Sequence, residues 1–222
     1  MTREEALAVA KPILFNTEMV QAIQDNRKSV TRRIIKPQPT TETPMYCYAA
    51  GRNKDIGKWV DKAGHQWAPP CRAGDIQYVR ETWFYEYHMH DLTEGKPDLP
   101  SGRYLHRFVF KAQDPNYSVD LGAMASGWRP SIHMPKEAAR IFLRVTEVRV
   151  ERLQDMRLVD CLAEGVLLSS IEKMDFIKGP LIARERYAGV WDSTIPKKEL
   201  ARYGWGANPW VWVIEFERME VQ

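Results

Sequence analysis

Apolar and polar residues alternate along several short segments of this chain, a pattern that is typical of β-strands with one covered face. The segments that predict strands are residues 30–35, 76–84, 103–111, 141–150 and 210–216. The parity of the apolar positions changes between Val145 and Val148, which predicts a β-bulge near Thr146. The last segment is apolar on both faces, so we expect a strand that is covered on both sides.

Helical periodicity lies between these strands. Residues 17–26 predict a short amphipathic helix with Thr17 as its N-cap and Asn26 as the left-handed residue that ends it. A second helix is predicted to start at Asp155, and a third to cover about 173–192. Short strands with helices between them indicate the α+β fold class, with a small β-barrel on a curved sheet as the expected closed form.

Two segments lack a clear period and are rich in polar and turn-forming residues. We expect residues 38–70 and 86–127 to be long loop insertions, and the first insertion to contain a hairpin around 58–67. The chain has no internal repeat. Residues 1–222 are therefore predicted to form a single domain that carries these insertions.

Composition narrows the class of protein only slightly. The 222 residues carry a formal net charge of +3, so a nucleic-acid footprint would have to be local. Three cysteines without a CxxC pair indicate free thiols in a reducing compartment. The acidic start of the chain and the lack of a long apolar run predict a cytoplasmic protein without a membrane segment.

Two groups of residues invite interpretation as zinc ligands. The first is Cys47, His65 and Cys71, in and directly after the first insertion, and the second is His88 and His90 in the other insertion. Their spacings match no compact zinc signature. We therefore expect no metal and no cofactor.

The densest chemistry lies where the first predicted helix gives way to the first predicted strand. An amine, a hydroxyl and three guanidinium groups follow one another there, on Arg27, Lys28, Thr31, Arg32 and Arg33. An amine with a lowered pKa can activate a threonine hydroxyl, and arginines can hold a developing oxyanion. The same side chains can instead bind a phosphate or form a solvated basic turn, and the sequence leaves these alternatives open.

Glu81 is a further candidate binding residue. It shares a face of its predicted strand with Val79, because side chains two positions apart point the same way. This places the carboxylate either in a cleft or in a structural ion pair with Arg32 or Arg33. The ion pair is the favoured alternative.

Aromatic and basic residues are interleaved near two other segments. Trp83 and Trp128 are aromatic residues of the kind on which the bases of single-stranded nucleic acids stack. Arg129, next to Trp128, is the kind of residue that contacts their phosphates. His133 follows in the same loop and is a candidate contact to a base or a phosphate. Core packing is the alternative role for these tryptophans.

Four stretches of the chain form an ordered set of motifs. They are Pro12–Asn16 with Arg27–Arg33, Gly74–Trp83, Trp128–Val150 with Ala163–Gly165, and Asn208–Phe216. Together they resemble the ASCH domain, a branch of the PUA-like β-barrel superfamily, in the larger form that bacteriophages and prophages encode. The resemblance implies a PUA-like barrel and binding of RNA.

The resemblance also implies roles for individual residues. Small ASCH members hydrolyse the acetyl amide of N4-acetylcytidine with a lysine and a threonine of a Lys-x-x-Thr stretch and a later glutamate. By position, Lys28 would be the proton acceptor, Thr31 the nucleophile and Glu164 the proton donor. Arg33 matches the arginine that follows this stretch.

Three functional hypotheses follow. The first is an ASCH-type protein that binds nucleic acid or a nucleoside and acts as an amidohydrolase on N4-acylated cytidine. The alternatives are a binding module for RNA or DNA without catalysis, and a nuclease. The expected partners are RNA, single-stranded nucleic acid or a modified nucleoside, and a phage-encoded protein would act in the bacterial host cell.

Overall fold

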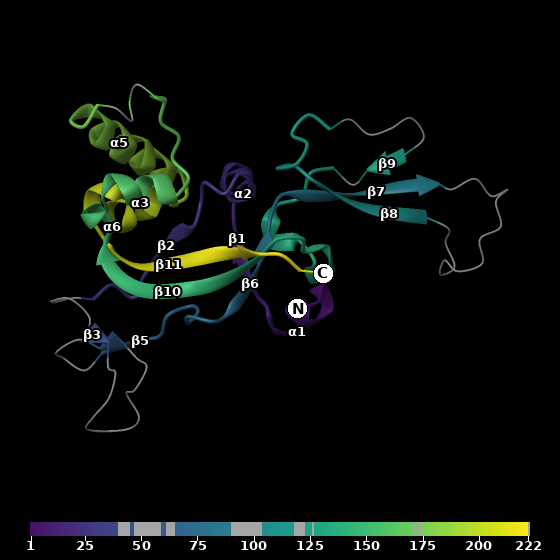
Figure 1. Cartoon of the computed structure of the whole chain (residues 1–222), viewed down its shortest axis with the longest axis horizontal. Helices are drawn as coiled ribbons and strands as arrows, with labels where there is room; N and C mark the ends of the chain where they lie inside the picture. Colours follow the sequence, from purple (N-terminus) through teal and green to yellow (C-terminus); the bar gives the residue numbers. More distant parts are fainter. Residues whose placement is uncertain are drawn as a thin grey trace. The chain divides into compact units, whose positions relative to one another are not determined.

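The computed structural model describes residues 1–39, 45–46, 59–60, 65–89, 104–117, 123–125, 127–170, 172 and 175–221. Its helices and strands are shown in Figure 1. The chain divides into two compact units. The first consists of Met1–Asp25, Ile76–Leu143 and Met219–Gln222, and the second of Asn26–Asp75 and Arg144–Arg218.

The first unit combines a parallel strand pair with a small antiparallel sheet. Its elements are α1 (Arg3–Val9), β1 (Lys11–Leu14), α2 (Thr17–Gln24), β6 (Ile76–Arg80), β7 (Trp83–Met89), β8 (Tyr104–Phe110), β9 (Ala123–Ala125) and the 3-10 turns η2 (Ser131–His133) and η3 (Lys136–Ala138). β1 runs parallel to β6. β7 lies between β8 and β9 and is antiparallel to both.

The predicted strand 76–84 is in fact two strands, because the chain changes its pairing partner at Glu81 and Thr82. β6 pairs with β1, whereas Trp83 and Arg129 exchange backbone hydrogen bonds of 3.2 and 2.7 Å at the start of β7. The prediction of one strand was wrong, since continuous apolar periodicity carries no sign of a new partner. The predicted strand at 103–111 is confirmed as β8.

The helix predicted from residue 17 is confirmed as α2, with one correction at its start. Asn16 is the N-cap, because its Oδ1 accepts the Met19 N–H at 2.8 Å, and Thr17 is the first helical residue. Asn26 has a φ of 55°, so the predicted left-handed residue after the helix is confirmed.

The core of the first unit joins residues that are distant in sequence. Ala6 of α1, Trp83 of β7, Met134 and Phe142 are each 2% exposed or less and pack in one cluster. Burial of large apolar side chains contributes roughly 1.5–3 kcal/mol each to folding. This cluster therefore holds the strand pair and the hairpin of β7 and β8 in a single unit.

The second unit carries helices on one side of a strand layer. Its elements are β2 (Val30–Ile34), β3 (Met45–Tyr46), β4 (Trp59–Val60), β5 (Gln66–Trp67), β10 (Phe142–Arg152, of which the first two residues belong to the first unit), η4 (Leu153–Asp155), α3 (Leu158–Ala163), α5 (Lys178–Ser193), η5 (Lys197–Glu199), α6 (Leu200–Tyr203), η6 (Trp205–Ala207) and β11 (Trp210–Met219). β11 is antiparallel to β2, with Val213 opposite Arg32 and Ile214 opposite Thr31. β3, β4 and β5 form a separate small sheet.

The predicted α+β class is confirmed, with a five-stranded mixed sheet in the order β1-β6-β10-β11-β2. In the described residues this sheet is open, and it does not close into the expected barrel. The strands predicted at 30–35 and 210–216 are confirmed as β2 and β11. The hairpin predicted around 58–67 is confirmed by the antiparallel pairing of β4 with β5.

Two helices of the second unit start later than predicted. Asp155, the predicted cap, is the last residue of the 3-10 turn η4, and α3 begins at Leu158 because the Asp160 carboxylate accepts the Arg157 N–H at 2.7 Å. α5 begins at Lys178, after a turn in which Asp175 accepts that residue's N–H at 2.8 Å. Asx-type capping therefore sets both helix starts.

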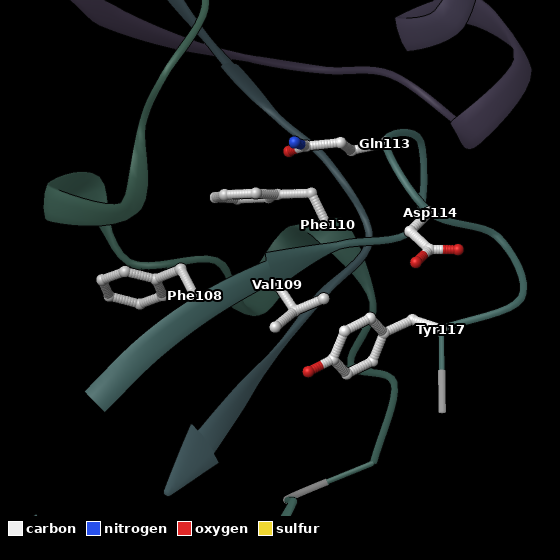
Figure 2. A pocket seen from close by; sticks show the side chains of 6 residues that line it. All are labelled: Phe108, Val109, Phe110, Gln113, Asp114 and Tyr117. Carbon is white, nitrogen blue, oxygen red and sulfur yellow. The ribbon is translucent and has the colours of Figure 1, made fainter. Parts of the chain in front are cut away.

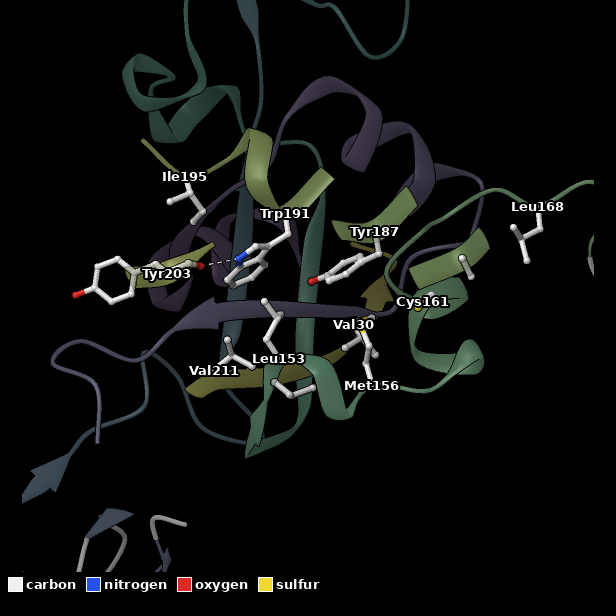
Figure 3. Close-up of a cluster of buried hydrophobic side chains, with 12 residues drawn as sticks. Val30, Leu153, Met156, Cys161, Leu168, Tyr187, Trp191, Ile195, Tyr203 and Val211 are labelled. Carbon is white, nitrogen blue, oxygen red and sulfur yellow. Dashed lines mark hydrogen bonds between the residues drawn. The ribbon is translucent and has the colours of Figure 1, made fainter. Parts of the chain in front are cut away.

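The strand layer of the second unit has two different faces. On the helix side, Val30, Val211 and Val213 pack with Tyr187 and Trp191 of α5, as Figure 3 shows for most of this cluster. The opposite face, here called the tryptophan side, packs a second cluster. Its members are Ile35, Trp67, Cys71, Val145, Trp210, Trp212 and Ile214, with Trp59, Val148 and Val150 partly buried against them.

The apolar side chains of β10 change from odd to even positions, as the sequence predicts. Val145 and Val148 both pack on the tryptophan side, although they lie an odd number of positions apart. Strict alternation would place them on opposite faces. The alternation therefore changes between them, as a bulge near Thr146 would require.

Candidate functional site

The basic segment before β2 is positioned by backbone pairing with the end of α3. Lys28 forms an isolated antiparallel bridge with Glu164, and the Ser29 N–H donates to the Ala163 carbonyl at 2.9 Å. The Ser29 carbonyl accepts the Phe216 N–H from β11, also at 2.9 Å. Residues that are far apart in sequence are thereby held beside one another by main-chain hydrogen bonds.

The Lys28 amine lies among three acceptors. Its Nζ donates to Glu164 Oε2 at 2.5 Å, to the Glu164 carbonyl at 3.0 Å and to the Val30 carbonyl at 2.8 Å. An ammonium group has three N–H donors, so this environment suits the charged form. Burial nevertheless lowers the pKa of Lys28, and the Glu164 carboxylate opposes that shift.

Glu164 is the centre of a buried ionic cluster, which we define as Lys28, Arg32, Glu164 and Tyr187. Its Oε1 accepts from Arg32 Nη1 at 3.2 Å and from the Tyr187 hydroxyl, also at 3.2 Å. The side chains of Lys28 and Arg32 are 0% exposed, and that of Glu164 is 3% exposed. The carboxylate therefore binds donors from β2 and α5 out of contact with solvent.

The charges of this cluster do not balance. Two buried cations share one buried carboxylate, and Arg32 Nε has no hydrogen-bond partner within the described part of the chain. Arg33 adds positive charge nearby; burial lowers the pKa of its guanidinium, and Glu164 opposes the shift. Buried cations without full compensation are costly, so the site favours an additional acceptor or anion.

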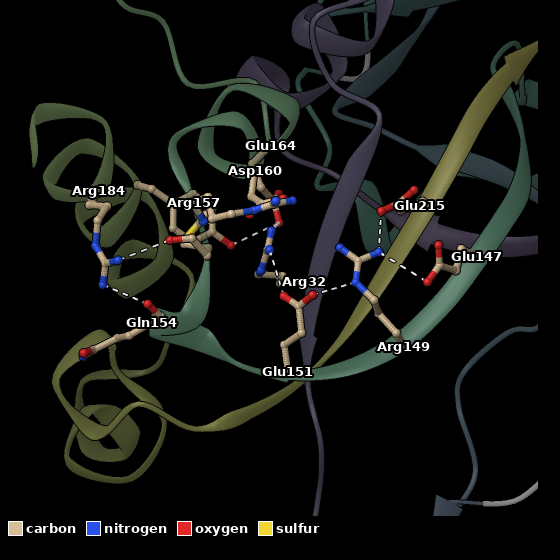
Figure 4. Close-up of polar contacts among 12 residues, drawn as sticks. Arg32, Glu147, Arg149, Glu151, Gln154, Arg157, Asp160, Glu164, Arg184 and Glu215 are labelled. Carbon is tan, nitrogen blue, oxygen red and sulfur yellow. Dashed lines mark hydrogen bonds and ion pairs between the residues drawn. The ribbon is translucent and has the colours of Figure 1, made fainter. Parts of the chain in front are cut away.

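A second layer of charge connects the cluster to the surface, as Figure 4 shows. Arg32 Nη2 lies 3.3 Å from Glu151 Oε2, and Glu151 Oε1 also accepts from Arg149 Nε at 2.6 Å. Arg149 in turn contacts Glu215 and Glu147. Glu151 is shared between two arginines and is about one quarter exposed, so it neutralises Arg32 only in part.

The structure does not bring Thr31 into this cluster. Arg32 and Val30 point to the helix side of β2, so alternation directs Thr31 to the tryptophan side, where Ile35 also packs. Thr31 is 3% exposed. Across the described residues, no hydrogen bond joins its hydroxyl to Lys28 or Glu164.

Arg27 lies close to the cluster. Its Nη1 donates to the Gly165 carbonyl at 3.1 Å, directly after Glu164. Gly165 has a φ of 95°, a left-handed conformation that turns the chain away at the end of α3. Of the predicted residues, the structure therefore brings Arg27, Lys28, Arg32 and Glu164 together.

Glu81 lies in the first unit and forms a different ion pair from the one expected. It accepts from Arg140 Nε and Nη2, both at 2.9 Å, rather than from Arg32 or Arg33. Gln24, with its side-chain oxygen turned toward the Arg140 guanidinium, accepts a further hydrogen bond from Arg140 Nη1 at 2.8 Å. Burial raises the pKa of Glu81, and the hydrogen bonds from Arg140 oppose that shift.

The predicted aromatic and basic contacts of the first unit differ in exposure. Trp83 is 2% exposed and belongs to the core, with the Arg129 guanidinium 5.5 Å from its ring centre. Trp128 is 37% exposed and available for stacking. His133 is exposed at the end of the η2 turn.

Sequence reasoning missed Tyr187 and Arg140, the partners that complete the two ionic groups. Tyr187 is one of several inward residues of α5, and nothing in its neighbours sets it apart from core packing. Arg140 lies 59 positions from Glu81. Only tertiary contacts identify these partners, so no local signal in the sequence could have found them.

Metal ligands and membrane segments can be assessed in the part of the chain that the structure describes. No group of three histidine, cysteine, aspartate or glutamate side chains there could hold a metal ion. Cys71 and Cys161 are buried and form no disulfide with each other, and burial raises the pKa of Cys161 to about 11. Cys47 and His90 lie outside the described residues. None of the described helices is long and apolar enough to span a bilayer.

Comparisons with family models, with curated proteins and with solved structures find no match to this chain. The ASCH resemblance therefore rests on the sequence motifs.

Proposed function

We propose that this protein is an ASCH-type nucleic-acid- or nucleoside-binding protein, and that the buried ionic cluster helps to bind an anionic group of its ligand. The observation that supports this proposal most strongly is the charge imbalance of the cluster. Lys28 and Arg32 share the Glu164 carboxylate, while Arg32 Nε lacks a partner among the described residues. A phosphate oxygen nearby would supply the missing acceptor and negative charge.

Energetics favour a ligand over a purely structural role. Moving an ion out of water costs several kcal/mol, which mutual attraction offsets only when the geometry satisfies every donor. Here Arg32 Nε stays unsatisfied among the described residues, Lys28 and Arg32 share the one buried carboxylate of the cluster, and Glu151 is shared between Arg32 and Arg149. Arginine is also the residue best suited to phosphate recognition, because its planar fork matches two oxygens.

The class of ligand follows from the ASCH resemblance. That resemblance implies a PUA-like barrel and an RNA-binding role, whereas the described strands form an open five-stranded sheet. The exposed Trp128 offers a surface on which a base can stack. RNA, single-stranded nucleic acid or a modified nucleoside is therefore the proposed partner.

The test is binding of fluorescently labelled single-stranded RNA over a range of salt concentrations. Arg32→Gln, with its fold checked by circular dichroism, should weaken binding about tenfold and reduce the slope of log affinity against log salt by about 1, as expected for loss of one phosphate contact. Arg144→Gln is the matched control, since Arg144 is in the same unit and its side chain is 51% exposed. Equal affinities and slopes for both variants would contradict the proposal.

A second candidate function is hydrolysis of an N4-acylated cytidine. It is favoured by the contact between Lys28 and Glu164 and by the burial that lowers the pKa of Lys28. In this reaction the Thr31 oxygen attacks the acyl carbon, and its proton passes to the amine. The amide C–N bond breaks, the cytosine amine leaves protonated, and water then releases the acyl group from Thr31.

This reaction requires Thr31 to reach the amine, which makes the experiment decisive. Purified protein is incubated with N4-acetylcytidine, and cytidine is measured by chromatography. Turnover by the wild type that is lost in both the Lys28→Ala and the Thr31→Ala variant would support the hydrolase hypothesis. No turnover by the wild type, or equal turnover by the wild type and Lys28→Ala, would contradict the hydrolase hypothesis. Labelled RNA and DNA that stay intact in the same incubation would exclude the nuclease alternative.

A further inference from the structure

The first unit contains a pocket beside the end of β8, shown in Figure 2. Its volume is about 190 Å³, and its lining residues are Phe108, Val109, Phe110, Gln113, Asp114 and Tyr117. Sites for drug-sized ligands are typically about 300–1,000 Å³. A pocket of this smaller size suits a single flat ring system, and its lining combines aromatic and apolar walls with the carboxamide of Gln113 and the carboxylate of Asp114.

The two polar groups come from a turn that is anchored at its base. The Phe110 carbonyl accepts the N–H groups of Gln113 and Asp114 at 3.0 and 3.2 Å. The Lys111 N–H donates to the Thr82 carbonyl at 3.0 Å, which ties the turn to the segment before β7. The carboxamide and the carboxylate therefore project from a backbone that is held in place, as a recognition site requires.

The Asp114 carboxylate is available to a ligand. The residue is exposed, and within the described part of the chain its side chain accepts one long hydrogen bond, 3.3 Å from the Asn116 N–H to Oδ1. A carboxylate has about four acceptor sites, and it has no donor. The complementary ligand must therefore present N–H groups to Asp114.

An aromatic row continues from the pocket to an exposed ring. Phe84 lies between two neighbours, with ring centres 5.7 Å from Tyr117 and 4.7 Å from Trp128. The Lys111 amine lies 6.0 Å from the centre of the Trp128 ring. Aromatic faces with an adjacent cation are the combination by which proteins bind the bases and phosphates of single strands.

We propose that this pocket binds a guanine base of a single-stranded nucleic acid. Guanine has two adjacent donors, N1–H and the N2 amino group, which match the two oxygens of Asp114. Each other base places an acceptor beside its donor, and that acceptor would face the carboxylate. The inference rests on the proposed nucleic-acid-binding function and adds a base preference to it.

The experiment is titration of the full-length chain with GMP, AMP, CMP and UMP, followed by isothermal calorimetry or ligand-observed NMR. GMP should bind about tenfold more tightly than the other nucleotides, because only guanine satisfies the carboxylate. Asp114→Asn should lose that preference and leave the AMP affinity unchanged. Tyr117→Ala should weaken GMP binding by a similar factor through loss of the aromatic wall.

Glu137→Gln is the matched control, since Glu137 is an exposed carboxylate of the same unit outside the pocket. Circular dichroism of each variant checks that the fold persists. Equal affinities for the four nucleotides, or an unchanged GMP affinity in Asp114→Asn, would overturn the inference.

The two proposals fail separately. RNA binding that depends on Arg32 but shows no guanine preference would remove the pocket inference and leave the proposed function standing. A GMP preference that depends on Asp114, with RNA binding insensitive to Arg32→Gln, would remove the role of the buried ionic cluster instead.

Discussion

Each unit of this chain buries an ionic group, and the two groups are built in different ways. In the first unit, one carboxylate meets one guanidinium: Glu81 accepts two hydrogen bonds of 2.9 Å from Arg140. In the second unit, Glu164 is shared by Lys28 and Arg32, and one donor of Arg32 has no partner in the described residues. The first group is balanced. The second is unbalanced, because two buried cations share its one buried carboxylate and the partly exposed Glu151 neutralises Arg32 only in part.

This difference separates a structural ion pair from a candidate binding site. Burial is common to both groups, so burial by itself does not distinguish them. The Glu81 pair has its charges matched and its guanidinium covered by the Phe110 ring, whose centre is 4.4 Å away. The unbalanced group is the one that gains from a bound anion, and we therefore place the proposed function there.

The largest expected effect comes from removing the carboxylate of the unbalanced group. Glu164→Gln leaves the buried Lys28 amine without its carboxylate and Arg32 with only the partly exposed Glu151, and should lower the free energy of unfolding by about 3–5 kcal/mol. Lys28→Met leaves Arg32 paired with Glu164 and should cost less, about 1–3 kcal/mol for the acceptors it leaves unsatisfied. Urea denaturation measures both, and a larger loss in Lys28→Met would contradict the imbalance.

A smaller effect is expected at the balanced pair. Glu81→Gln should lower the free energy of unfolding by about 2–3 kcal/mol, because the Arg140 side chain is 24% exposed and can recover some hydration. Arg140→Met should cost a similar amount, since its apolar stem is kept. The double variant completes a cycle in which we expect a coupling of about 1–2 kcal/mol. Additive losses would show that the two residues do not form a stabilising pair.

The smallest effects are expected in the pH dependence of stability, and they fall in different ranges for the two groups. The pKa of Glu81 is raised above its ordinary value of 4.5 in the folded state. Its contribution is therefore fully present below that value and is lost as pH rises through the folded pKa. The advantage of the wild type over Glu81→Gln should be larger at pH 4 than at pH 7.

The pKa of Lys28 is instead lowered from 10.5 in the folded state. Its contribution is present above that value and is lost as pH falls through the folded pKa. The stability of the wild type relative to Lys28→Met should therefore increase as pH rises toward 10.5. Denaturation series at several pH values measure both trends, and a flat difference curve for either variant would contradict the pKa shift on which it depends.

Much of the local structure could be predicted, because it depends on neighbours in the sequence. The alternation of apolar residues predicts β2 and β11, and the left-handed Asn26 after α2 follows from residue type. The break between β6 and β7 could not be predicted, since it arises from a change of pairing partner at Glu81. α1 and β1 were also missed, because both are short and their periodicity is weak.

The sequence by itself determined which groups are available for chemistry: an amine, arginines and a carboxylate in motifs that resemble one family. Only the tertiary structure decided how they combine. Pairing of β2 with the end of α3 joins Lys28 to Glu164, and packing of α5 adds Tyr187. The alternation of β2 turns Thr31 to the other face. Charge balance and side-chain direction depend on contacts between distant segments, and local sequence patterns do not contain those contacts.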